Sequence, residues 1–195
     1  SLLDSPGALV SIRTDEESLA LSLVRDCAIT LGIPLRQWDI VHGIQDGLIT
    51  PSEPETGTEH PAAALIRFTR YTEPAICLML DAAGHLEDER TLRAMRQSVA
   101  HFALRTDLGL RLVLIDHKET LPHVIRTYAS VMTLSVPDGK EIEDLVKATV
   151  RRLNKLHTID AAMTNRELAA MVGNLRGLTR RQVEQIITAV SLDDR

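Results

Sequence analysis

A carboxylate at the end of an apolar run is the first feature of this sequence that could do chemistry. In the stretch CLMLDAAGHLEDE, residues 77–89, four apolar residues lead to Asp81, and small residues and further acids follow it. A carboxylate in this place can bind a metal ion and, through the metal, a phosphate group. Its ordinary structural role is to cap the turn after a strand, and we expect that role for Asp81.

A second group of acids lies near the start of the chain. The stretch SIRTDEES, residues 11–18, contains Asp15, Glu16 and Glu17 but no glycine and no lysine. A phosphate-binding loop needs glycines, which let backbone amides converge, and a lysine that offsets the phosphate charge. Here the acids themselves occupy the positive end of the following helix. A triphosphate would meet three like charges within ~10 Å, where salt screens little, so we expect no nucleotide at this junction.

The elements that must position these acids alternate between strands and helices. Apolar or alternating runs predict five strands, at residues 8–12, 34–41, 75–80, 110–116 and 131–136. Helical spacing predicts four helices before residue 137, within residues 13–32, 62–71, 87–106 and 121–129. Residues 42–61 are rich in glycine, proline and acids, which is typical of a long mobile loop. The expected class is α/β, with a five-stranded parallel sheet covered by helices on both faces.

After Pro137 the pattern changes to helices only, which are expected at residues 138–156, 164–173 and 179–191. Three helix starts have the spacing of a capping box, in which a hydroxyl and an acid or amide three residues later each bind an orphan backbone amide: Thr14 with Glu17, Thr164 with Glu167, and Thr179 with Gln182. We therefore expect an α/β domain over residues 1–137 and a small three-helix subdomain over residues 138–195.

Composition excludes several functions. The net charge is −5 and aromatic residues make up 3% of the chain, so a basic groove and base-stacking platforms for nucleic acid are not expected. Cys27 and Cys77 lie in apolar stretches without a Cys-x-x-Cys partner, which indicates a reduced, cytoplasmic compartment. No apolar run approaches the ~20 residues that span a bilayer. Because the first residue is Ser1 rather than Met, we expect the chain to be part of a longer polypeptide.

The order of elements and the tail resemble the AAA+ ATPase module. PDGKEIEDLVKATVRRL, residues 137–153, is similar to the start of the helical lid of that family. LAAMVGNLRGLTRRQVEQIITAV, residues 168–190, is similar to its closing helices. The run from Thr14 to Ile44 further resembles the degenerate leading module of some bacterial and plastid AAA proteins, in which a nucleotide-binding AAA+ module follows in the same polypeptide. The resemblance implies a P-loop-NTPase-like sheet with a lid-like subdomain.

The resemblance also implies roles for single residues. In the family, the carboxylate at the end of the third strand helps to hold Mg²⁺ and a following Glu orients the attacking water. Asp81 corresponds to the first, but Ala82 stands in place of the Glu and cannot polarise water. Asp116 stands at the end of the fourth strand where the family has Asn, Ser or Thr, and Arg180 lies near the nucleotide-sensing arginine of the lid. We interpret Asp81, Asp116 and Arg180 as relics of a nucleotide site.

The leading hypothesis is a non-catalytic AAA-like domain that contacts, regulates or helps to assemble the active AAA+ module of the same polypeptide. Further copies of the chain, in a homo-oligomer, are a second expected partner. ATP and Mg²⁺ would be cofactors of the parent protein, an ATP-hydrolysing enzyme, and not of this chain. A different class of hypothesis is an ATPase domain that binds nucleotide through a non-standard loop.

Two alternatives use the acids without a nucleotide. Asp15 and Glu16 could join Asp81 in a metal site that holds no phosphate. The same acids, with Lys118, could also be read as a receiver-like signalling domain that is phosphorylated on Asp81. Lys118 follows the fourth expected strand, whereas receivers have this lysine after the fifth.

Overall fold

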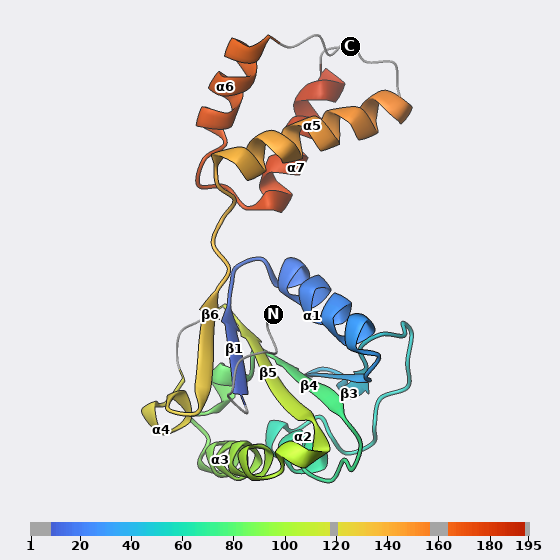
Figure 1. Ribbon diagram of the computed structural model, residues 1–195, viewed down its shortest axis with the longest axis vertical. Coiled ribbons are helices and arrows are strands. Elements are labelled where there is room, and N and C mark those ends of the chain that lie inside the picture. The colour runs from blue at the N-terminus through green and yellow to red at the C-terminus, as the bar shows by residue number, and fades with distance from the viewer. Residues whose placement is uncertain (1–8, 118–120, 157–163, 194–195) are drawn as a thin grey trace. The chain divides into compact units, whose positions relative to one another are not determined.

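The computed structural model describes residues 9–117, 121–156 and 164–193, which form two compact units (Figure 1). The first unit ends at Leu134 and the second begins at Ser135, close to the proline that was expected to end the last strand. The first unit contains a sheet and its covering helices, and the second contains helices.

The first unit has six strands: β1 (Leu9–Arg13), β2 (Leu35–Asp39), β3 (Gly43–Asp46), β4 (Ala75–Leu80), β5 (Leu110–Asp116) and β6 (Ala129–Thr133). Its α-helices are α1 (Glu17–Leu31), α2 (Pro61–Phe68), α3 (Glu89–Leu104) and α4 (His123–Arg126). Two short 3₁₀ helices are η1 (Ala82–His85) and η2 (Thr106–Leu108).

The strands form one sheet in the order β3-β2-β4-β5-β1-β6. All pairs are parallel except β2 with β3, which is antiparallel. The α/β class with a mainly parallel sheet is confirmed. The sheet has six strands rather than the five expected, because residues 43–46 form an additional edge strand inside the segment that was taken for a loop.

Both faces of the sheet are covered, as the unbroken apolar run in β4 predicted (Figure 1). Alternate β4 side chains point to opposite faces, so Ile76, Leu78 and Leu80 pack with α1. Cys77 and Met79 belong to the other core cluster, to which α2 and α3 contribute. Residues of β1, β4 and β5 contribute to both cores, and this packing positions the carboxyl ends of the three strands, where the acids of interest lie.

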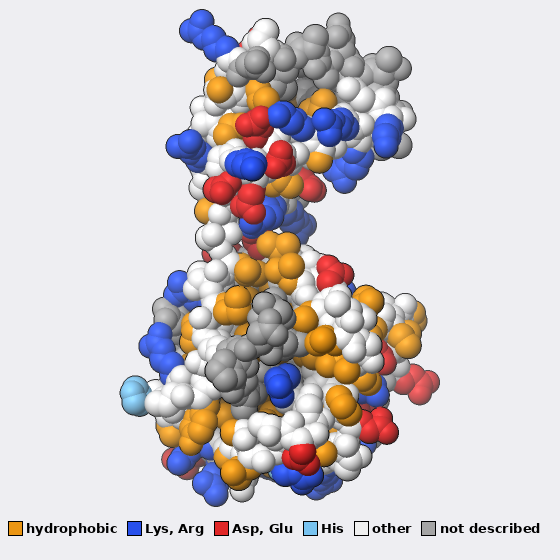
Figure 2. All heavy atoms as spheres, in the orientation of Figure 1, with side chains coloured by type: hydrophobic (Ala, Val, Ile, Leu, Met, Phe, Trp, Pro, Cys, Tyr) orange, Lys and Arg blue, Asp and Glu red, His pale blue; other side chains and the backbone are white. Residues whose placement is uncertain are grey.

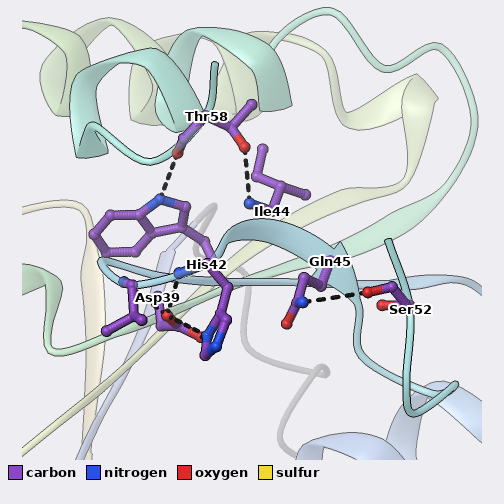
Figure 3. A network of polar contacts seen from close by, with 8 residues as sticks. Asp39, His42, Ile44, Gln45, Ser52 and Thr58 are labelled. Atoms are coloured by element: carbon purple, nitrogen blue, oxygen red, sulfur yellow. Dashed lines mark hydrogen bonds and ion pairs between the residues drawn. The ribbon is translucent and has the colours of Figure 1, made fainter. Parts of the chain in front are cut away.

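Residues 47–61 are fastened to β2 and β3 rather than free, which corrects the expectation of a long mobile loop (Figure 3). The fully buried Trp38 donates its indole N–H to the Thr58 carbonyl oxygen at 2.7 Å. The Thr58 hydroxyl accepts from Ile44 N at 2.8 Å and donates to the Glu55 carbonyl oxygen at 2.6 Å. Ser52 Oγ accepts from Asp46 N, and Gln45 donates to the Ser52 carbonyl oxygen. The polar residues that made this segment look like a loop use their side chains to bind backbone groups, and these hydrogen bonds hold the segment in place.

The second unit consists of α5 (Gly139–Leu156), α6 (Asn165–Asn174) and α7 (Arg180–Asp193). Its small core is built from five buried residues: Ile142, Val146, Leu175, Val183 and Ile187. The capping boxes at α6 and α7 are confirmed, since each threonine hydroxyl accepts from the backbone amide three residues on, while the residue there accepts from the threonine amide. Asp138 and Glu141 form a similar reciprocal pair at the start of α5.

Candidate functional site

Asp81 and Asp116 lie beside each other at the carboxyl edge of the sheet, because β4 and β5 are neighbouring parallel strands. Asp81 has a left-handed backbone, with φ of 52°. Its amide donates to the Ile115 carbonyl oxygen at 2.9 Å, which continues the strand pairing. The exposed Asp81 carboxylate contacts Nδ1 of His117 at 2.9 Å, a contact that the sequence did not predict. The side chain therefore faces solvent at the strand end, and the expectation that it caps the following turn is wrong, because it makes no side-chain cap to η1.

Asp116 is buried, with only 5% of its surface exposed. One of its oxygens, Oδ1, accepts from the Ala83 amide at 2.8 Å, so Asp116 caps the first turn of η1. Its other oxygen, Oδ2, is buried and has no hydrogen-bond partner. Burial raises the pKa of Asp116 to about 6, and the charge of Asp81 adds to this, while the Ala83 hydrogen bond and His117 oppose it.

The junction between β1 and α1 lies next to these acids. Thr14 N donates to the Asp116 carbonyl oxygen at 3.0 Å, which ties the junction to the end of β5. The predicted capping box of Thr14 with Glu17 is wrong, because the Thr14 hydroxyl accepts from Glu16 N at 2.9 Å and the N-cap of α1 is Glu16 without a side-chain cap. Asp15 and Glu16 therefore precede the helix, and only Glu17 lies in its first turn.

A hollow of about 190 Å³ lies between the junction and the strand ends, and we call it the acidic hollow. Its lining residues are Thr14, Asp15, Glu17, Asp81, Ile115, Asp116 and His117. Four carboxyl groups thus face a space that has neither lysine nor arginine in its lining. Such a lining disfavours phosphate, because it places like charges around the space and offers no lysine or arginine to offset them.

The candidate metal residues do not form a ligand set. Within residues 9–117, 121–156 and 164–193 there is no group of three or more His, Cys, Asp or Glu side chains that could hold a metal ion. Asp15 and Asp81 line the acidic hollow, whereas Glu16 is not part of its lining. A metal site made from Asp15, Glu16 and Asp81 stays a prediction without a geometric arrangement to support it.

Arg180 lies at the start of α7 and binds groups of its own unit. Its guanidinium donates to the Ser135 carbonyl oxygen at 3.1 Å and to the Glu141 carboxylate at 3.0 and 3.2 Å. Both contacts with Glu141 come from Nη2, and they join the beginnings of α5 and α7. These contacts give Arg180 a structural role in the helical unit, in addition to the sensing position that the resemblance implied.

The strand order separates this sheet from a receiver. Taking the parallel strands in chain order, the sequence across the sheet is 5-1-4-3-2, with β5 between β1 and β4. Receivers have the order 2-1-3-4-5, in which the first and third strands are neighbours. Asp81 therefore lies two strands away from the acids after β1, which disfavours the receiver-like alternative. Lys118 lies outside the described residues.

A second, larger hollow of about 800 Å³ was missed in the sequence. It lies between α2, α3 and residues 54–58, and we call it the arginine groove because its lining includes Arg67, Arg70, Arg90 and Arg93. The only sequence signal was the spacing of Arg90 and Arg93, which places them on one face of a helix. Nothing in the sequence showed that α2 would bring two further arginines opposite them.

No helix in the described part of the chain is long and apolar enough to cross a membrane. The comparison with curated proteins gives no match.

Solved structures of AAA proteins are similar to the chain in fold. The AAA domain of FIGL-1 in complex with ADP has a TM-score of 0.64 at 11% identity, over 96% of this chain and 61% of that one. PCH-2 of C. elegans has a TM-score of 0.58 at 11% identity, over 96% and 55%. A chain of the HORMA:CdnC:Trip13 complex of E. coli MS115-1 has a TM-score of 0.58 at 14% identity, over 86% and 59%. The chain thus spans little more than half the length of these structures, and at such identities the likeness shows the fold alone.

The sequence itself identifies the family. Residues 1–134 match the model of the N-terminal domain of SpoVK-like AAA ATPases, which is more than half of the chain. This agrees with the AAA-like fold of the sheet unit and confirms the resemblance to a leading module of an AAA protein. The chain belongs to the family of SpoVK-like AAA ATPase N-terminal domains.

Proposed function

We propose that this chain is a non-catalytic AAA-like domain that acts by protein contact, on the AAA module of the same polypeptide. The observation that carries the proposal is the acidic hollow, at the carboxyl edge of the sheet where α/β folds bind their ligands. Its acids occupy the place where a phosphate tail would require amides and a cation.

The position that would activate water for hydrolysis is also occupied by an unsuitable residue. Ala82 follows Asp81 and is buried in η1, and its methyl group can neither accept a proton nor orient a water molecule. The buried Asp116 uses one oxygen to cap η1 and has a raised pKa, so it serves the local fold rather than a metal. ATP and Mg²⁺ would be held by the linked AAA module, which would be the enzyme of the parent protein.

A role in contact is supported by exposed apolar side chains. Ile29, Val41 and Ile49 are more than 60% exposed. Figure 2 shows hydrophobic side chains gathered on one face of the sheet unit, around α1. Apolar surface of this kind is typical of sites that meet another protein. The contact would regulate the linked module or help copies of the protein to assemble, for example into a homo-oligomer.

Calorimetric titration of the chain with ATP and with ADP, each with Mg²⁺, tests the proposal. We expect no heat of binding up to millimolar nucleotide, since each uncompensated carboxylate in the hollow repels the phosphates. A thermal-shift measurement at the same concentrations should show no rise in melting temperature. Binding in the micromolar range would reject the proposal and favour a nucleotide-binding domain with a non-standard phosphate loop.

A further inference from the structure

The arginine groove is the feature of the molecule that the proposed function leaves unused. Its volume of about 800 Å³ is several times that of the acidic hollow. The lining contains four arginines and one acid, Glu55, although the chain as a whole has a net charge of −5. Figure 2 shows Lys and Arg side chains along the edge of the sheet unit where Figure 1 places α2 and α3. A concentration of positive charge against the overall balance indicates a local attraction for anions.

The lining of the groove combines charged side chains, which we call its walls, with apolar side chains, which we call its floor. Arg90, Arg93 and Gln97 follow one another at spacings of three and four residues, so they form one wall along α3. Arg67 and Arg70 contribute the opposite wall at the end of α2. Between the walls the surface is formed by alanine side chains and one isoleucine: Ala62, Ala63, Ile66 and Ala94. Small side chains leave the space, and their methyl groups offer an apolar contact.

One of the four arginines is already neutralised. Arg67 donates from Nε to the Glu55 carboxylate at 2.6 Å, and the Tyr71 hydroxyl donates to the other Glu55 oxygen at 2.6 Å. Partial burial of Glu55 opposes its ionisation, but these hydrogen bonds outweigh it and lower the pKa of the carboxyl group. Glu55 is therefore a charged, fixed part of the wall at neutral pH.

The other three arginines have no such partner. Among the described residues, no acidic side chain forms an ion pair with Arg70, Arg90 or Arg93, and each of the three is exposed. Guanidinium groups bind carboxylates in a bidentate manner and are enriched at protein interfaces. Three of them around an apolar floor match a ligand that carries several acids and an apolar side chain.

The composition of the lining discriminates between classes of anion. Single-stranded nucleic acid is bound on aromatic platforms, and the lining contains no aromatic side chain. A free phosphate or polyphosphate would use the guanidinium groups alone and would leave the apolar side chains of the lining without a contact. An acidic peptide uses both features, since its carboxylates reach the walls while an apolar residue lies on the floor.

We propose that the arginine groove binds an acidic segment of a partner protein, with carboxylates on Arg70, Arg90 and Arg93 and an apolar side chain against Ile66 and the alanines. This contact is separate from the acidic hollow, so it stands or falls independently of nucleotide binding. It gives the domain a second docking surface, recognised by charge.

Fluorescence anisotropy with the full chain tests the proposal. The probes are labelled peptides of about ten residues, long enough as a helix to span ~15 Å. Each contains several Glu residues and one Leu, and the position of the Leu differs from peptide to peptide. Matched peptides carry Gln in place of Glu. We expect at least one acidic peptide to bind, its affinity to fall as salt is raised from 50 to about 300 mM, and the Gln peptides not to bind.

Variants locate the site. Arg93→Glu should weaken peptide binding about tenfold or more, because it removes one attraction and adds a repulsion. Arg90→Glu should act similarly. Arg96→Glu is the matched control, since Arg96 is an exposed arginine of the same helix that does not line the groove. Circular dichroism checks that all three variants fold.

Three outcomes would overturn the proposal. The first is that no acidic peptide binds, and the second is that the Gln peptides bind equally well. The third is that Arg93→Glu and Arg96→Glu weaken binding equally, which would indicate general attraction to the surface. Inorganic tripolyphosphate serves as a competitor: if it binds the groove and the peptides do not, the groove recognises small polyanions instead of a protein segment.

Discussion

The acidic hollow and the arginine groove belong to the same α/β unit and have opposite character. The hollow is small and lies at the carboxyl edge of the sheet, with Asp81 and Asp116 at the ends of β4 and β5 and with Asp15 and Glu17 in the junction and first turn of α1. The groove is large and lies on the helical layer, with one wall made from the loop that follows β3. The place where an α/β fold usually recognises a phosphate is lined here by acids, while four arginines, the proposed site for an acidic segment, lie on the outer helices.

This difference shows that the residues that determine the fold are not the residues that determine what the site can bind. The two cores need only apolar residues in the strands and on the inner face of each helix, which the chain supplies. A phosphate site needs glycine, lysine and free amides, and residues 11–18 contain neither of the first two. Recognition on the helices requires only exposed side chains of one charge, which a stable scaffold tolerates at little cost.

Of the changes that test this contrast between the hollow and the groove, a substitution of Trp38 should have the largest effect. Trp38→Ala removes a fully buried ring and the hydrogen bond to Thr58, so the free energy of unfolding should fall by about 3–5 kcal/mol. Because Thr58 and residues 54–57 form one wall of the groove, peptide binding should be lost before the sheet unfolds. Urea unfolding measures the first effect and anisotropy in buffer the second.

Trp38→Phe is the matched control for that change. It keeps much of the apolar volume but loses the indole N–H and part of the ring, and should cost about 1–3 kcal/mol, less than Trp38→Ala. If Trp38→Ala leaves peptide binding intact in the folded protein, the wall does not depend on the loop network, and the contrast between a rigid hollow and a loop-built groove is wrong.

The next effect concerns the acidic hollow and its dependence on pH. The pKa of Asp116 is raised to about 6 in the folded chain, from an ordinary value near 3.8. Between these values the folded protein holds a proton that the unfolded chain has lost, so stability falls as pH rises through this window. Asp116→Asn should remove this fall and stabilise the protein at pH 7 by about 1–3 kcal/mol.

Asn can still accept from Ala83 N, and a neutral NH2 group takes the place of the charged oxygen that has no partner, so the cost of the buried charge is removed. Thermal unfolding from pH 4 to pH 8, with the parent chain and Asp116→Asn measured side by side, gives the difference at each pH. Parallel curves for the two proteins would show that the hollow does not resist charge, and the comparison would lose its acidic half.

Much of the fold could be predicted from the sequence because its signals are local. The unbroken apolar run of β4 and the threonine boxes at α6 and α7 each depend on residues close in the chain. The antiparallel strand β3 could not be predicted in this way. It has only four residues, and it is held by Thr58, Ser52 and Glu55 from a later segment.

The sites divide along the same line. The acids after β1 and β4 could be expected to meet, since carboxyl ends of parallel strands lie at one edge. The contact of His117 with Asp81, and the capping of η1 by Asp116, depend on turns whose geometry no motif encodes. The arginine groove depends on how α2 packs against α3, and composition alone gave no reason to expect a basic groove.

The smallest expected effect is that of a change at Glu55, the one acid in the lining of the arginine groove. Glu55→Gln removes the charge that neutralises Arg67; its single oxygen can still accept from Arg67, and its NH2 group can donate to the Tyr71 hydroxyl. Loss of the ion pair should cost up to about 1 kcal/mol of stability, because the pair is partly exposed. The freed charge of Arg67 should increase the affinity for the acidic peptide about two- to fivefold at low salt, and the gain should vanish as salt is raised.

The matched control is Glu59→Gln. Glu59 is an exposed acid outside the lining, so this variant changes the net charge equally and should leave peptide affinity unchanged. Equal gains for both variants would mean that net charge, and not the groove, attracts the peptide.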